Sequence, residues 1–154
     1  MYYIGVDGGG TKTTFTMINN MGEKITQYTT KTTHYEQVGF DGLEDTLNEG
    51  LSKIIEKSNL DIDKIDSVFL GIPGYGEVKS VVKKINCICE RVFNKIEFRI
   101  GNDVEAGFEG SLAGKPGINI VSGTGSIALG KDLYGNTIRC GGWGDYVGDE
   151  GSAH

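Results

Sequence analysis

Asp7-Gly8-Gly9-Gly10-Thr11-Lys12-Thr13 is the stretch around which the rest of the chain is organised. It lies between two short, β-branched apolar runs, Tyr2 to Val6 and Thr14 to Ile18, which predict two strands joined by a tight turn. Because glycine has no Cβ, the backbone N–H groups of such a turn can approach a ligand closely and form an anion site. The stretch therefore predicts a strand–turn–strand unit that binds a phosphate group.

The polar residues of this turn favour the same interpretation. Thr11 and Thr13 supply hydroxyl donors. The Asp7 carboxylate would repel a bare phosphate, so it indicates a metal ion that the phosphate also binds. The alternative is an ordinary glycine hairpin, which a lone Gly-Gly pair would favour. An aspartate, three glycines and two threonines together favour a phosphate loop.

Length, charge and cysteine spacing limit the class of protein. The 154 residues predict one domain over 1–154, which buries about two-thirds of its unfolded surface. A net charge of −6 argues against a nucleic-acid partner, although backbone donors and a divalent cation can still hold nucleotide phosphates. There is no apolar run of roughly 20 residues and no visible secretory signal, so no membrane partner and a cytoplasmic location are expected. Cys87, Cys89 and Cys140 lack zinc spacing and are predicted to be buried, reduced thiols.

Beyond the turn, the chain alternates strands and helices. A third strand over Glu23 to Lys31 would complete an antiparallel meander. Helices are predicted over about 39–58, 77–93 and 104–112, and strands over 68–72, 96–100, 117–121 and 127–130. The end of the chain, from Gly141, is predicted to be a glycine-rich loop, and no internal repeat is visible. The pattern predicts an α/β domain whose mixed sheet contains a three-strand meander and is flanked by helices.

Two common nucleotide-binding motifs do not explain the glycine turns. A Walker loop requires Gly-Lys-Ser/Thr, whereas Lys12 follows Thr11. The segment 123–128 fits the spacing G-x-G-x-x-A, but a dinucleotide site needs a helix to begin there, and the sequence indicates a hairpin. Two glycine–threonine turns remain, at 7–13 and 122–126. A fold that brings them together could hold a polyphosphate from two sides.

Asp103, Trp143 and Asp149 are candidate site residues outside the turns. Asp103 follows a strand and precedes a helix, where Asn and Asp are common caps; between two phosphate loops it could instead be a general base. Trp143 follows Gly142 in a glycine-rich loop, which suits stacking on the apolar face of a sugar and, nearly as well, a packing role. Asp149 could bind hydroxyls or a metal, or could simply be solvated.

Four motifs in order resemble the N-acetylglucosamine kinase and glucosamine kinase group of the BadF/BadG/BcrA/BcrD-type ATPase family, in the actin-like ATPase superfamily. The motifs are 7–13, 101–103, 122–126 and 141–144 together with 148–153. The resemblance implies a ribonuclease-H-like domain, the first of two that close over ATP, Mg²⁺ and a sugar. Members of the group are much longer than this chain. The chain is therefore expected to be an N-terminal domain, truncated before a C-terminal domain, with little activity by itself.

The resemblance also implies roles for individual residues. The ATP phosphates would be held by Gly8, Gly9, Gly10, Thr11, Lys12 and Thr13 on one side and by Gly123, Thr124 and Gly125 on the other. Asp103 would accept the proton of the sugar hydroxyl that attacks the γ-phosphoryl group, and Asp7 would face the metal. The sugar would be contacted by Thr33, His34, Asn102, Asp103, Gly142, Trp143 and Asp149. Thr33 replaces an asparagine of the mammalian members, which leaves the preference for an N-acetyl group open.

The expected activity is therefore ATP-dependent phosphorylation of a hexosamine, either N-acetylglucosamine or glucosamine. The implied partners are a small-molecule sugar and ATP, and a homodimer is left open. One alternative is an ATPase activator subunit of the 2-hydroxyacyl-CoA dehydratase or benzoyl-CoA reductase type, although Cys87-Ile88-Cys89 does not resemble its cluster ligands. A glucokinase of the repressor–kinase group lacks support because its zinc motif is absent. A non-catalytic sugar-sensing module is the remaining alternative.

Overall fold

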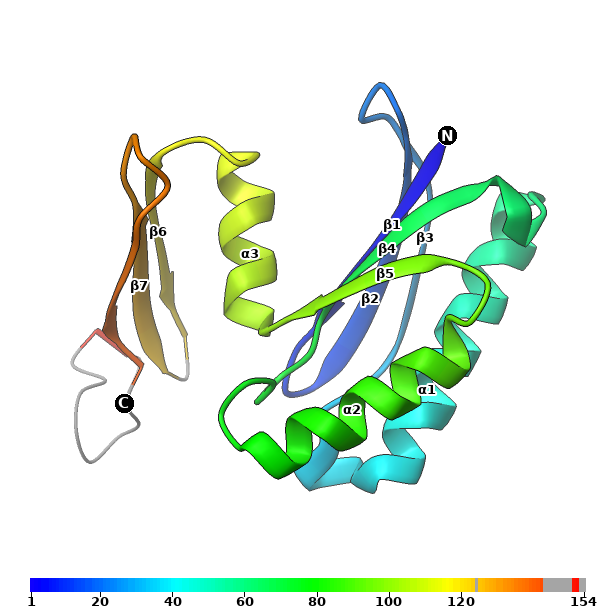
Figure 1. Cartoon of the computed structure of the whole chain (residues 1–154), viewed down its shortest axis with the longest axis horizontal. Helices are drawn as coiled ribbons and strands as arrows, with labels where there is room; N and C mark the ends of the chain where they lie inside the picture. The colour runs from blue at the N-terminus through cyan, green and yellow to red at the C-terminus, as the bar shows by residue number, and fades with distance from the viewer. Residues whose placement is uncertain (124, 143–150, 153–154) are drawn as a thin grey trace. The chain divides into compact units, whose positions relative to one another are not determined.

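The computed structural model describes residues 1–123, 125–142 and 151–152. The chain divides into two compact units, residues 1–106 and 107–154. Figure 1 shows the helices and strands of both units. Each unit is described by itself below.

Unit 1 is built on a five-stranded mixed sheet, sheet A, with the strand order β3-β2-β1-β4-β5. The strands are β1 (Tyr2–Gly8), β2 (Lys12–Asn19), β3 (Lys24–Lys31), β4 (Ile65–Gly71) and β5 (Glu97–Gly101). β1, β2 and β3 form an antiparallel meander, while β4 runs parallel to β1 and β5 parallel to β4 (Figure 1). The predicted α/β class and the predicted meander are confirmed.

Two long helices cover one face of sheet A (Figure 1). In the part of the chain that the structure describes, the helices are α1 (Tyr35–Ser58), α2 (Lys79–Val92) and α3 (Asp103–Leu112), with a short 3-10 helix, η1 (Ile62–Lys64). α1 begins at Tyr35, but Gly39 (φ 71°, ψ 177°) is not helical and separates a first short turn from the longer part of the helix, so the start predicted near residue 39 coincides with this break. Within the described ranges, no helix has the length and apolar character needed to cross a membrane.

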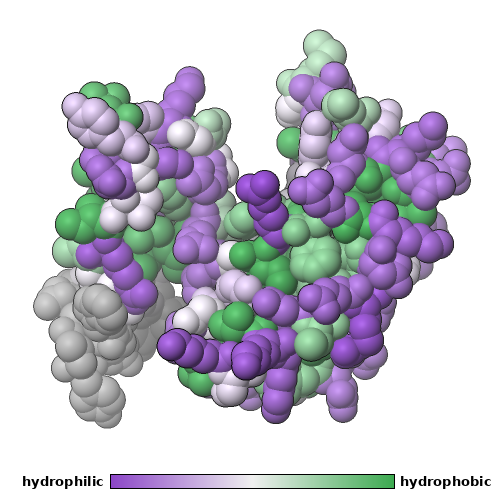
Figure 2. All heavy atoms as spheres, in the orientation of Figure 1, coloured by the Kyte–Doolittle hydropathy of each residue, from purple (hydrophilic) through white to green (hydrophobic). Residues whose placement is uncertain are grey.

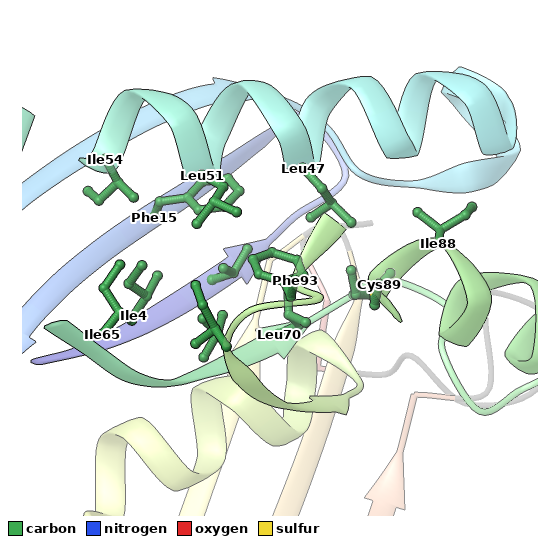
Figure 3. Packing of buried hydrophobic residues seen from close by; sticks show 14 of the residues in the cluster. Ile4, Phe15, Leu47, Leu51, Ile54, Ile65, Leu70, Ile88, Cys89 and Phe93 are labelled. Atoms are coloured by element: carbon green, nitrogen blue, oxygen red, sulfur yellow. The ribbon is translucent and has the colours of Figure 1, made fainter. Parts of the chain in front are cut away.

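The core of unit 1 lies between these helices and the sheet. Leu43, Leu47, Leu51 and Ile54 are buried on α1 at the spacings of three and four that the sequence shows. They meet alternate residues of β1 and β2, including Phe15, and Figure 3 shows Phe15, Leu47 and Leu51 between α1 and the sheet. Gly50 lets the ring of Phe15 come close to α1, since a Cβ there would lie 2.1 Å from it. On the outside of α1 and α2, hydrophilic side chains predominate (Figure 2).

Unit 2 contains an antiparallel sheet, sheet B, with the order β6-β7-β8. Its strands are β6 (Gly117–Ser122), β7 (Ser126–Lys131) and β8 (Thr137–Gly141), and β8 was not predicted from the sequence. A hydrogen bond links α3 to sheet B: the Ser111 hydroxyl on α3 accepts from Asn119 Nδ2 on β6 at 2.8 Å. On this sheet, Ile118, Ile120 and Ile138 are 72%, 71% and 74% exposed.

The two units share one structural motif, a three-strand meander, which was not recognised as a repeat in the sequence. Each contains a three-strand meander whose first two strands are joined by a glycine turn. The pairing ends at Gly8 and Thr13 in sheet A and at Ser122 and Ser126 in sheet B. Strand pairing requires only alternation and a turn, so the two meanders need share few residues.

The three cysteines differ in exposure. Cys89 is buried, whereas Cys87 and Cys140 are exposed, so the prediction of buried thiols is wrong for these two. Residues two positions apart on a helix face different directions, which explains the contrast on α2. Burial, with a smaller contribution from the charge of Glu90, raises the pKa of the Cys89 thiol to about 12.

This difference predicts the order in which the thiols react. At about pH 8, we expect an aromatic disulfide reagent to label Cys87 and Cys140 in the folded chain, because only accessible thiolates react readily. Cys89 should react only after unfolding. A chain carrying both Cys87→Ser and Cys140→Ser should release no chromophore until denaturant is added. Fast labelling of that folded variant would contradict the prediction.

Candidate functional site

The predicted site residues of unit 1 gather at one edge of sheet A. β1, β3, β4 and β5 all run in the same direction, so their carboxyl ends lie at a common edge. The glycine turn follows β1, Thr32–His34 follows β3, the segment from Ile72 follows β4, and Asn102 follows β5. Ligands of α/β sheets bind at the carboxyl ends of strands. The topology thus brings together residues that are about 90 positions apart in the sequence.

The glycine turn has the predicted hairpin form. The N–H group of Gly9 donates to the Lys12 carbonyl at 2.8 Å and closes the turn between β1 and β2. Asp7, Gly10, Thr11 and Lys12 are exposed. Their side chains and backbone donors are therefore accessible to a ligand.

Thr32 and Thr33, which directly follow β3, make contacts that stabilise the glycine turn. The Thr32 hydroxyl donates to the Gly9 carbonyl at 2.7 Å. The hydroxyls of Thr13 and Thr33, both 0% exposed, lie 3.1 Å apart and share a hydrogen bond. A Cβ on Gly8 would lie 2.5 Å from Thr33 Oγ1, so only glycine allows this close approach.

His34 is the next residue along this edge. Its N–H group donates to the Thr32 hydroxyl at 2.9 Å, which fixes the backbone. The ring lies 5.8 Å from that of Tyr35, which stacks on Phe40 at 5.6 Å. Nδ1 of His34 is buried and has no hydrogen-bond partner among the described residues. Because an unpaired buried polar atom is costly, this nitrogen needs a hydrogen-bond partner that the described residues do not supply.

Asn102, and not Asp103, caps α3. Asn102 Oδ1 accepts the N–H of Val104 at 2.9 Å, and the Asn102 carbonyl accepts that of Ala106 at 3.0 Å. Glu105 Oε2 accepts the Asn102 N–H at 3.1 Å, which completes a capping box. Asp103 is the first helical residue, so its carboxylate is not needed as the cap.

The surroundings of Asp103 disfavour its charged form. Burial raises the pKa of the Asp103 carboxyl above its ordinary value, and the charges of Asp7 and Glu77 add to this increase. The nearby N–H groups of Val104 and of Asp103 itself favour the charged carboxylate and oppose this increase in pKa. A half-buried carboxyl with a raised pKa at the end of a strand is a candidate general base.

The remaining predicted residues belong to unit 2. Gly123 and Gly125 form the turn between β6 and β7, where the Gly123 N–H donates to the Gly125 carbonyl at 2.9 Å. Gly142, with φ 71°, follows β8, and Arg139 donates to its carbonyl. A Cβ on Gly142 would lie 2.9 Å from Ile127 Cδ1, so Gly142 lies at the same end of sheet B as the turn. Of the predicted residues, Thr124, Trp143 and Asp149 lie outside the described residues.

Several residues of this edge were not predicted from the sequence. The Thr32 hydroxyl bonds to the glycine turn, the charge of Glu77 contributes to the raised pKa of Asp103, and the Tyr75 carbonyl accepts a hydrogen bond from Asn102. Of the unpredicted residues, only Glu105 could have been found from the sequence, since a Glu three residues after an N-cap residue indicates a capping box.

Within the described part of the chain, no group of three or more His, Cys, Asp or Glu could hold a metal ion.

Comparison with known proteins shows that the chain is similar to an ATPase family and to two curated sugar kinases. The model of the BadF/BadG/BcrA/BcrD ATPase family matches residues 4–154. The chain is 32% identical to N-acetyl-D-glucosamine kinase of Dictyostelium discoideum over 160 residues, covering 99% of this chain and 50% of that protein. It is 29% identical to N-acetylmuramic acid/N-acetylglucosamine kinase of Clostridium acetobutylicum over 163 residues, with the same coverage, 99% and 50%.

A solved structure shows the same fold. The crystal structure of an inferred N-acetylglucosamine kinase from Chromobacterium violaceum superposes with a TM-score of 0.77 at 24% identity. The match covers 98% of this chain and 52% of that one. The chain thus spans about half the length of the curated relatives that it matches.

Proposed function

The chain belongs to the BadF/BadG/BcrA/BcrD ATPase family, and we propose that it supplies the N-terminal part of a kinase that phosphorylates a hexosamine. The transferred group is the γ-phosphoryl group of ATP, and the acceptor is a hydroxyl of N-acetylglucosamine or glucosamine. The observation that carries this proposal is Asp103, a half-buried carboxylate that is free of the capping role and shares a sheet edge with the glycine turn.

Asp103 is proposed as the general base. Its carboxylate accepts the proton of the sugar hydroxyl, the hydroxyl oxygen bonds to the γ-phosphorus, and the bond to the bridging oxygen breaks to release ADP. The raised pKa makes Asp103 a stronger proton acceptor than an ordinary aspartate. Since phosphoryl transfer depends on positioning and charge stabilisation, the surrounding residues contribute mainly by holding the reactants.

The exposed glycine turn is proposed to hold the ATP phosphates. The N–H groups around Gly10, the Thr11 hydroxyl and the Lys12 ammonium are exposed donors, and Gly123, Thr124 and Gly125 would supply the second loop. Mg²⁺, when bound, neutralises phosphate charge. Asp7 fits such an ion because its carboxylate is exposed beside the turn, and Mg²⁺ commonly takes only one or two protein carboxylates and otherwise water and phosphate.

The buried Nδ1 of His34 supports a sugar at the same edge. It lacks a partner among the described residues, so a sugar hydroxyl or amide could satisfy it. Thr33 is fully buried and bonded to Thr13, so we assign it to support of the glycine turn. Gly142, Trp143 and Asp149 are proposed to contact the sugar as well. A cytoplasmic location and a homodimer are also part of the proposal.

The activity can be tested directly on the complete kinase that contains this chain. We expect coupled ADP release to depend on glucosamine or N-acetylglucosamine and on a divalent cation, with glucose as the matched sugar lacking the nitrogen substituent. Chelation of the metal should reduce turnover to background. ATP hydrolysis that is independent of sugar, together with visible iron absorption, would contradict the proposal and favour an activator ATPase. Sugar binding without turnover would favour a sensing module.

A further inference from the structure

The loop after β4 and the start of α3 are joined by one side chain, that of Asn102. Its Oδ1 caps the helix through the Val104 N–H at 2.9 Å, as described above. Its Nδ2 donates to the Tyr75 carbonyl at 3.3 Å, across 27 positions of sequence. Both polar atoms of the Asn102 side chain therefore already have partners within the protein.

The loop that Asn102 reaches is itself held at two further points. The Tyr75 hydroxyl donates to Asn86 Oδ1 on α2 at 2.9 Å. The Ile72 N–H donates to the Gly101 carbonyl at 3.0 Å, next to Asn102 in the sequence. The same loop carries Glu77, one of the two carboxylates whose charges act on Asp103. Asn102 thus connects α3, which begins with Asp103, to the loop after β4, which carries Glu77.

We propose that Asn102 is a positioning residue for Asp103, which it holds in place by tying the first turn of α3 to the loop after β4. This assignment rests on the proposed function, and it replaces the sugar contact that the family resemblance implies for Asn102. The bond to Val104 sets where α3 begins, and the bond to Tyr75 sets how close the loop lies. Loss of either bond lets the Asp103 carboxylate move away from the attacking hydroxyl, and a displacement of this kind slows the chemical step.

Two substitutions in the complete kinase separate these bonds. Asn102→Ser keeps an oxygen that can cap the helix but is too short to reach the Tyr75 carbonyl, whereas Asn102→Ala removes both bonds. We expect kcat to fall about tenfold for Ser and about 100-fold for Ala. The dissociation constant of the sugar, measured by calorimetry, should change less than about twofold because no sugar contact is lost.

Glu105→Gln is the matched control. The glutamine oxygen can still accept the Asn102 N–H, so the capping box and the link to Tyr75 both remain. We expect its kcat to stay within about twofold of the parent. A weaker affinity for the sugar in Asn102→Ser, with kcat unchanged, would overturn the assignment and restore Asn102 as a sugar ligand.

Hydrogen exchange gives a second test that does not depend on turnover. In Asn102→Ser, the amides of Tyr75 and Glu77, which bond to Ile72 and Gly74, should exchange faster than in the parent. The amides of Val104 and Ala106 should keep their protection because the cap remains. Unchanged exchange in the loop would overturn the link between Asn102 and Tyr75 in any case. Faster exchange in a protein that phosphorylates no sugar would instead count against the proposed function.

Discussion

Asp103→Asn is expected to abolish phosphoryl transfer and, at the same time, to stabilise unit 1. The amide cannot accept the proton of the sugar hydroxyl, and loss of a general base lowers kcat by about 100-fold to 10,000-fold. Stability changes in the opposite direction because burial raises the pKa of the Asp103 carboxyl in the folded chain. At neutral pH, the folded chain must therefore keep an unfavourable charge, which asparagine removes.

The sign of this effect fixes how it depends on pH. A raised folded pKa means that protonated Asp103 stabilises the fold. This stabilisation is fully present below the ordinary aspartate pKa of about 3.9 and is lost as the pH rises through the folded pKa. We therefore expect Asp103→Asn to gain on the order of 0.5–1 kcal/mol in urea unfolding at about pH 7. The gain should shrink as the pH is lowered.

Asp132→Asn is the matched control for this prediction. Asp132 is an exposed aspartate whose pKa is lowered, chiefly by a hydrogen bond from the Asn136 side chain. Its charged form stabilises the fold above the ordinary aspartate pKa, so the same substitution should not stabilise the chain at neutral pH. Turnover within about tenfold of the parent in Asp103→Asn would contradict its assignment as the base. A loss of stability in that variant would contradict the effect of burial on its charge.

Local patterns in the sequence were sufficient for most of the elements of unit 1. Alternation in β1 and β2 and the spacing of Leu43, Leu47 and Leu51 reflect the faces that these elements bury. The turn of helix before Gly39 was missed because the sequence shows only the boundary at this glycine, which the structure has as a non-helical break within α1. β8 was missed because its five residues, Thr137–Gly141, have an exposed burial pattern and no long apolar alternation.

The candidate site was predictable only where a single segment carries its chemistry. The glycine turn and Asp103 were found because their residue types and neighbours in the sequence are informative. The contact between Thr13 and Thr33 that supports this turn was not found from the sequence. These two residues are 20 positions apart and meet only when β3 folds back on β2. The link from Asn102 to Tyr75 likewise depends on β5 lying beside β4. Tertiary pairing, and not local pattern, creates these contacts.

Gly8→Ala is expected to damage both the stability of unit 1 and the phosphate turn. The added Cβ would lie 2.5 Å from Thr33 Oγ1, 2.6 Å from the Gly71 carbonyl oxygen and 2.9 Å from Pro73 Cδ. Because one of these is a backbone atom of the adjacent strand and another belongs to a proline ring, the strands themselves must move. We expect a loss of about 1–3 kcal/mol in unfolding free energy, as for overpacked cores, and a fall of about 100-fold in kcat as the turn shifts.

Gly5→Ala separates this steric effect from the general cost of changing a glycine in β1. Gly5 lies three residues earlier on the same strand, and a Cβ there would meet no atom within 4 Å. Alanine at such a position restricts the unfolded chain, so we expect Gly5→Ala to be neutral or to stabilise by up to about 1 kcal/mol. Urea unfolding of both variants measures the difference. Equal stability of the two would show that sheet A can yield at Gly8, and that the close approach of Thr33 and Gly71 does not determine the position of the turn.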